Sequence, residues 1–363
     1  MAMLERLNLK GKNQSKIRLG FYPYTYVRTI VMRTLLLKKE DYHKLLKMGF
    51  SEIASFLQES NYKAEIDSLA TSYSGADLIE IALNKNLAGS FKKLMKISPN
   101  ELGLLIREFA KRRDIDDIKT ILRGRHTNSS KETILYSLKA AGTLPYEYLA
   151  SLLQKKTIRE ILAYNGIIDF TELEISLKEF EKKNNLSVIE NALDKSYYQN
   201  LLQFSKRLPK EGALFRDFLV KEVEVINLMT LLRLKKAGLD KDSIKSYMIF
   251  YDDKVKDSKL SQFAATADFE KLSSLLEKCE HGEILLKEIE KYSKTGSLIS
   301  LESELYRQLL RQSTLFMHQH PLTIDNILGY MFAKDMEVRN LRIIVKGKQL
   351  GLSEDFIEKQ LIF

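Results

Sequence analysis

The chain has 363 residues, enough for two or three domains, and with 44% hydrophobic and 29% charged residues it is not a disordered tail. A single cysteine excludes a disulfide framework, and with only 16 glycines and five prolines the chain has too few turn residues for an all-β fold. A net charge of +10 favours an anionic partner such as nucleic acid, an acidic protein or a lipid surface, although a basic surface without a special partner is equally open.

From the sequence we expect neither a secretory signal nor a membrane span. Its first 20 residues are basic and lack the apolar core of a secretory signal. The most apolar later stretch, 314–333, contains His318, His320, Pro321 and Asp325, so it does not read as a membrane span. We therefore expect an intracellular protein that is soluble or peripheral to a membrane.

Hydrophobic periodicity predicts helices along the whole chain. Apolar residues recur at intervals of three and four positions, and alternating strand patterns are nearly absent. In chain order, we predict helices over residues 41–57, 75–96, 189–206, 215–236 and 301–317. The fold class predicted from this pattern is all-α.

One sequence pattern occurs three times, at 113–125, 224–235 and 337–348. Its form is an acidic residue, a β-branched residue, any residue, Asp or Asn, and then an aliphatic stretch that ends in basic residues. The copies are spaced by 110 and then 113 residues, and Pro99, Pro209 and Pro321 precede them at a nearly constant distance. An upstream segment, 78–85, is also echoed at 188–195 and more weakly from Leu301.

A repeat of this length is the size of a domain and can bury its own core. We therefore predict three similar helical domains, arranged around a pseudo-three-fold axis or in a row. Our predicted cuts give domains 1–110, 111–221 and 222–363, and the sequence leaves the phase of these cuts open because no Gly/Ser-rich linker marks them.

Residues suited to catalysis or metal binding are sparse. Cys279 with His281, and His318 with His320, have a spacing that does not converge on one ion when the backbone is helical. No phosphate-binding loop or nucleophile elbow is present, and the paired carboxylates Asp116 and Asp117 are interpreted as solvated or paired with arginine. We predict no enzymatic activity, no cofactor and no metal.

Basic residues occupy equivalent positions in the three copies. Arg123, Arg233 and Lys346 share one phase of the repeat. Two interpretations stay open: contact with an acidic partner, or pairing with the negative helix end or with an acidic residue of a neighbouring repeat. Because the positive charge is spread over all repeats and is not gathered in one patch, nucleic-acid binding is the less favoured function.

The motifs of these repeats resemble one known family: the C subunit of archaeal-type (A-type) ATP synthases, the counterpart of the d subunit of eukaryotic vacuolar ATPases. The similarity extends over nearly the whole chain, and its segments include 26–28, 40–42 with 45–46, 77–87, 116–124, 189–198, 227–235, 333–342 and 347–348. The middle helix departs conservatively from the family pattern, since it starts Glu222-Val223-Glu224 where acidic-Ile-Asp is expected.

The resemblance implies a funnel-shaped, non-catalytic part of the rotor. It implies a place between the D and F subunits of the central stalk and the membrane-embedded proteolipid ring, at the cytoplasmic face of the cell membrane. There it would transmit the torque that couples ion transport to ATP synthesis or hydrolysis. We predict Arg123, Arg233 and Arg339 as interaction residues. The alternative from another class is a basic helical scaffold that binds an acidic protein or RNA.

Overall fold

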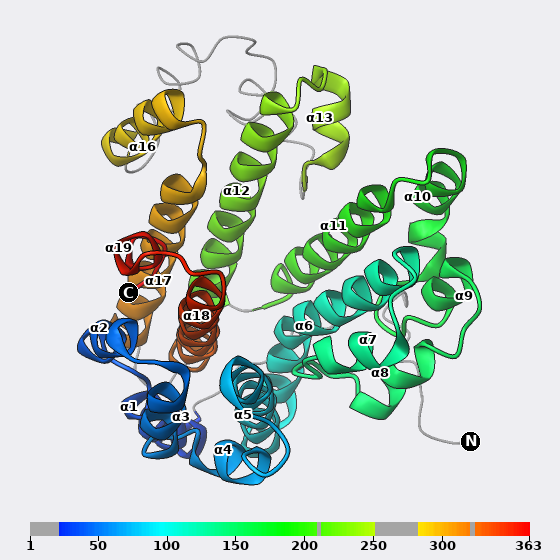
Figure 1. Cartoon of the computed structure of the whole chain (residues 1–363). Coiled ribbons are helices and arrows are strands. Elements are labelled where there is room, and N and C mark those ends of the chain that lie inside the picture. Colours follow the sequence, from blue (N-terminus) through cyan, green and yellow to red (C-terminus); the bar gives the residue numbers. More distant parts are fainter. Residues whose placement is uncertain (1–21, 209–211, 251–281, 320–323) are drawn as a thin grey trace.

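The computed structural model describes residues 22–208, 212–250, 282–319 and 324–363 (Figure 1). All regular secondary structure in these ranges is helical, which confirms the predicted all-α class. Six helices of 20 to 27 residues dominate the fold. They are α5 (Gly75–Ile97), α6 (Asn100–His126), α11 (Leu186–Ser205), α12 (Ala213–Lys236), α17 (Ile299–Gln319) and α18 (Ile324–Gln349).

Shorter helices connect and flank the long ones. Before α5 come α1 (Pro23–Thr34), α2 (Lys39–Lys47), α3 (Phe50–Gln58) and α4 (Lys63–Leu69). Between α6 and α11 lie α7 (Lys131–Ser137), α8 (Tyr146–Leu152), α9 (Ile158–Ala163) and α10 (Phe170–Lys183). The remaining ones are α13 (Lys241–Tyr247), α16 (Gly282–Thr295) and α19 (Glu354–Glu358).

The predicted long helices are present, with one correction near the N-terminus. The helix predicted over 41–57 is wrong, because the chain forms α2 and α3 with a break at Met48 and Gly49. Gly49 has extended backbone, and its N–H donates to Glu52 Oε2 at 2.7 Å, so a new helix begins there. The apolar pattern continues through this break, which is why periodicity alone did not reveal it.

The six long helices form a closed ring of contacts. Each packs against the next in chain order, and α18 returns to pack against α5. Figure 1 shows the result as three arms, formed by α6 with α11, by α12 with α17, and by α18 with α5. Every arm therefore joins the second long helix of one repeat to the first long helix of the next.

The repeat is also present as a set of equivalent hydrogen bonds. In the second and third copies, the side-chain amides of Asn227 and Asn340 each bond the backbone N–H and C=O of the residue 22 positions later, at 2.6–2.9 Å. In the first copy Asp117 takes this position and accepts from the N–H groups of Lys139 and Ala140, both at 2.8 Å. Asp117 is fully buried, so its interpretation as a solvated carboxylate is wrong.

The two ends of the described chain meet in one core. Helix α1 packs against α18, and α19 packs against α2. The apolar core runs continuously from the N-terminal helices to the C-terminal residues, with a smaller second cluster around α12 and α13. The predicted domain cuts at 110/111 and 221/222 fall inside α6 and α12, and the cut positions stay a prediction.

Candidate functional site

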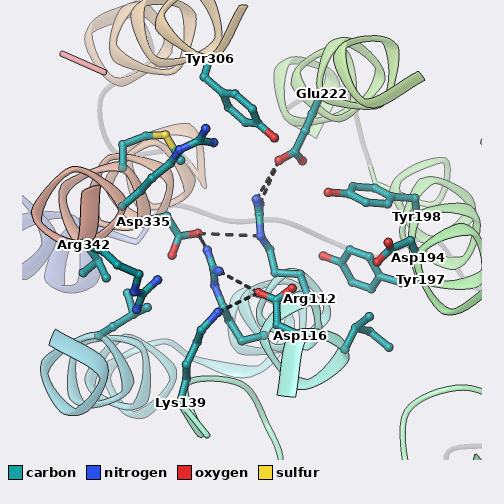
Figure 2. Close-up of a pocket in the computed structure, with 16 residues that line it drawn as sticks. Arg112, Asp116, Lys139, Asp194, Tyr197, Tyr198, Glu222, Tyr306, Asp335 and Arg342 are labelled. Carbon is teal, nitrogen blue, oxygen red and sulfur yellow. Dashed lines mark hydrogen bonds and ion pairs between the residues drawn. The ribbon is translucent and has the colours of Figure 1, made fainter. Parts of the chain in front are cut away.

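A polar cavity lies at the centre of the helix ring. It has a volume of about 250 Å³, and all six long helices contribute side chains to its wall. Arg112, Glu222 and Asp335 come from α6, α12 and α18 and meet at this cavity (Figure 2). Their positions are separated by 110 and 113 residues, which is the spacing of the sequence repeat. The cavity therefore lies where the three copies of the repeat converge.

Ion pairs connect the three copies across the cavity. The guanidinium of Arg112 donates to Glu222 at 2.7 Å, and its Nε lies 3.8 Å from Asp335 Oδ2. Arg113 bridges Asp335 and Asp116, and the Arg113–Asp116 distance is 3.1 Å. Glu222 and Asp335 are almost completely buried, so these pairs act with little screening by water.

The charges in the cavity shift one another's titration. Burial would raise the pKa of Asp116, but the nearby cations Lys139 and Arg113 outweigh burial and lower it. Burial raises the pKa of Glu222, and Arg112 opposes this shift. Burial also lowers the pKa of Lys139, although Asp116 lies 3.6 Å away. The cavity thus holds an interlinked set of charges and no isolated acid–base pair.

Tyrosines form the remaining polar wall. Tyr197 and Tyr198 of α11 pack edge to face, with ring centroids 4.9 Å apart. The Tyr197 hydroxyl donates to the backbone carbonyl of Phe109 on α6 at 3.0 Å. Tyr306 of α17 lies beneath the guanidinium of Arg339, which is 4.4 Å from its ring centroid. These contacts hold α11 against α6 and α17 against α18.

Comparison with known proteins shows what this arrangement belongs to. The family described as ATP synthase (C/AC39) subunit matches residues 26–360. The chain belongs to this family. The A-type ATP synthase C subunit of Methanosarcina acetivorans is 41% identical over 368 residues, covering 100% of this chain and 99% of the relative. Proteins of the same name from Methanococcoides burtonii and Haloferax volcanii are 38% and 32% identical, covering 100% and 93% of this chain and 100% and 97% of the relatives. The resemblance seen in the sequence is confirmed.

The equivalent cations of this C/AC39 family member form ion pairs between neighbouring repeats. Each one lies on the second long helix of a repeat and pairs with a carboxylate on the first long helix of the next: Arg123 with Glu190 at 2.6 Å, Arg233 with Glu302 at 2.5 Å, and Lys346 with Glu80 at 2.6 Å. The alternative that these cations pair with an acidic residue of a neighbouring repeat is therefore confirmed. The third of these pairs closes the ring.

The three predicted interaction residues do not gather at one point. Arg123 and Arg233 are exposed on different arms of the ring. Arg339 is half-buried at the central cavity, where it shares Glu302 with Arg233. Contact of these residues with a partner stays a prediction.

Sequence reasoning missed the central charges themselves. Arg112, Glu222 and Asp335 lie one or two positions before the start of the repeated pattern. Their side chains differ in sign, so they do not stand out when copies are compared for likeness. The signal that could have found them is a position that is charged in all three copies but changes the sign of its charge from copy to copy.

Other candidate chemistry receives no support in the described ranges. No group of three His, Cys, Asp or Glu side chains that could hold a metal occurs there, and Cys279, His281 and His320 lie outside the described residues. Among the helices of the described part, none has the length and apolar character needed to cross a bilayer.

Proposed function

We propose that this protein is a non-catalytic component of the central stalk of a rotary A-type ATP synthase. In this role it links the D and F subunits of the shaft to the proteolipid ring at the cytoplasmic face of the membrane. It transmits the torque that couples ion movement to ATP synthesis or hydrolysis. The proposal is supported by membership of the C/AC39 family and by the names of the relatives.

The observation that carries this proposal is the closed ring of helices with an ion pair across each junction of repeats. A part that passes torque between a narrow shaft and a wide ring has to resist twisting. A closed ring of packed helices resists deformation because every arm is supported on both sides. We propose that the three arms surround a pseudo-three-fold axis and form a funnel, with the cavity on that axis.

Helix α1 is the surface that we propose to face the proteolipid ring. Tyr24, Val27, Val31 and Leu35 follow one another along one side of it, and each is between 52% and 64% exposed. An apolar stripe of this kind on a surface helix suits an interface. Residues 22–39 carry four basic and no acidic side chains, which is favourable beside an anionic leaflet.

The test is a pull-down of the tagged protein from detergent-solubilised native membranes, with bound proteins identified by mass spectrometry. We expect shaft and proteolipid subunits with the wild-type chain. We expect the double variant Val27→Asp/Val31→Asp to lose the proteolipid subunits and keep those of the shaft. Ile175→Asp is the matched control, because Ile175 is 81% exposed on α10 and lies outside α1.

Two results would count against the proposal. Recovery of RNA or unrelated acidic proteins without ATP synthase subunits would favour the alternative of a basic scaffold. If the Ile175→Asp control lost the proteolipid subunits to the same extent, α1 would not be the contact surface. The arginine prediction is tested in the same way, since Arg123→Ala, Arg233→Ala and Arg339→Ala should each weaken shaft recovery if these side chains contact it.

A further inference from the structure

The C-terminal ends of α6, α12 and α18 lead into the same backbone structure. Each helix is followed by a turn and then by the short helix α7, α13 or α19, and we call these segments the first tip (127–135), second tip (237–245) and third tip (350–358). A residue with positive φ lies in each turn, at Asn128, Gly238 and Gly351. A side-chain oxygen then caps each short helix, from Ser130, Asp240 and Ser353. Both sets have the spacing of the repeat, so the tips present their exposed positions equivalently.

The exposed side chains of the three tips nevertheless differ. In the third tip Leu350, Leu352 and Phe356 are 73%, 39% and 44% exposed. The equivalent residues of the first tip are exposed and polar: Thr127, Ser129 and Thr133. In the second tip, Leu239 is the only large apolar residue at these positions, and it packs against the small core cluster. Because the first tip forms the same turn and cap with polar residues, the fold does not require apolar ones in the third. Such residues on a surface indicate a contact with a partner.

The third tip also differs in charge. Glu354 takes the position at which the other two tips have Lys131 and Lys241. Helix α19 carries three acidic and no basic residues. Glu354 and Asp355 are exposed, and neither forms an ion pair within the part of the chain that the structure describes. In a chain with a net charge of +10 this is a local acidic surface, and a partner with lysine or arginine beside apolar side chains would complement it.

The third tip lies apart from the surface that we propose to face the proteolipid ring. Helix α1 packs against α18, and the backbone N–H of Leu37, which follows α1, donates to Glu337 at 2.6 Å. From Glu337 to Leu350 the rise of an α-helix amounts to about 20 Å. A part that couples the ring to the shaft needs a second contact surface away from the ring, and the third tip is in such a position.

We propose that the third tip binds the shaft, through its three exposed apolar side chains and the carboxylates of Glu354 and Asp355. Because the shaft is a partner only under the proposed function, this contact rests on it. The surface of the shaft that meets the tip carries apolar residues with lysine or arginine around them. The apolar side chains supply the buried core of the contact, and the carboxylates at its rim select basic neighbours and fix the orientation. The first and second tips lack this combination, so the third arm makes this contact.

The test exchanges residues between tips. The triple variant Leu350→Thr/Leu352→Ser/Phe356→Thr gives the third tip the side chains of the first, so it should melt at the wild-type temperature. In the pull-down from solubilised native membranes it should recover at least about tenfold less of the shaft subunits, because central apolar residues of an interface commonly carry that much affinity. It should keep the proteolipid subunits. Glu354→Lys, which introduces the lysine of the other tips, should also lower shaft recovery. Ile175→Thr is the matched control, since it removes an exposed apolar side chain from α10 on another arm.

Failure of this contact and failure of the proposed function give different results. If the wild-type chain recovers neither shaft nor proteolipid subunits, the proposed function fails and the shaft contact fails with it. If the wild type and the triple variant both recover both, the third tip does not bind the shaft, while the proposed function stands. Loss of the proteolipid subunits from the triple variant would overturn the contact as well, because the tip would then face the ring.

Two measurements on the purified chain complete the test. If thermal melting shows that the triple variant is less stable than the wild type, recovery of the shaft by Glu354→Lys decides, and unchanged recovery overturns the contact. Light scattering measures the oligomeric state. We expect a monomer. An oligomer of the wild type that the triple variant disperses would assign the third tip to a second copy of this chain and would overturn the shaft contact.

Discussion

At the scale of single residues, the centre of the ring is where the three copies of the repeat have to differ. Identical charged residues from three copies would face each other there and repel in a weakly screened environment. Arg112 instead meets Glu222 and Asp335, so a position that is equivalent in all copies carries one positive and two negative charges. The second cation needed for balance comes from Arg113.

The buried carboxylate of Asp117 gives a prediction for pH dependence. Burial raises its pKa to about 6, above an ordinary value of about 3.8, so folding favours the protonated form. Its contribution to stability is complete below pH 3.8 and is lost as the pH rises through 6. Relative to Asp117→Asn, which does not titrate there, the wild-type free energy of unfolding should fall by up to about 3 kcal/mol over this window.

Urea unfolding of both proteins at several pH values between 3.5 and 7 measures this difference. A difference in unfolding free energy that is independent of pH would contradict the prediction. If the stability of the wild type relative to Asp117→Asn increased with pH, the two backbone N–H donors of Lys139 and Ala140 would favour the charged carboxylate more strongly than burial disfavours it.

At the scale of helices, glycine allows two of the long helices to pack closely against the short helix that follows each of them. A Cβ on Gly347 of α18 would lie 2.6 Å from the side chain of Ile357 of α19, and Gly124 of α6 has the same relation to Ile134 of α7. These isoleucines are buried and are spaced as the repeat is. The middle copy has Leu234 at the glycine position, so the close approach belongs to the first and third copies.

Replacing glycines should therefore have opposite effects at different sites. Gly347→Ala should destabilise the protein by about 1–3 kcal/mol, because the new methyl group forces α18 and α19 apart. Gly89→Ala is the control in the interior of α5, where a Cβ would meet nothing within 4 Å. It should stabilise by about 0.5–1 kcal/mol through the lower chain entropy of alanine. Chemical denaturation measures the change in unfolding free energy for both variants. Changes of the same sign would refute this explanation.

At the scale of the whole molecule, a buried polar cluster closes the N-terminal helices onto the last long helix. Lys334 of α18 is fully buried and donates to Glu337 at 2.6 Å and to the Tyr62 hydroxyl at 3.0 Å. Glu337 also accepts from the Tyr62 hydroxyl at 2.7 Å and from the backbone N–H of Leu37 at 2.6 Å. One carboxylate thus fastens the N-terminal helices to the last long helix.

Removing the charge of Lys334 should open this closure first. Lys334→Met leaves Glu337 buried without its cation, so we expect a loss of about 3–5 kcal/mol. Amide hydrogen exchange should speed up in α1–α4 and α18, and the helices α9 and α10 of another arm should keep their wild-type protection. Uniform acceleration over the whole chain would show that the cluster supports overall stability and not the closure in particular.

The sequence by itself determined the helical class, the family and the spacing of the three copies, because periodicity and repetition are local properties of the chain. It also placed Arg123, Arg233 and Lys346 at one phase. Only the tertiary structure decided that their partners lie on the next repeat, and that the copies close into a ring with Arg112, Glu222 and Asp335 at its centre. Those contacts join residues that are 67 to 266 positions apart, and a repeat shows which positions are equivalent but not which of them meet.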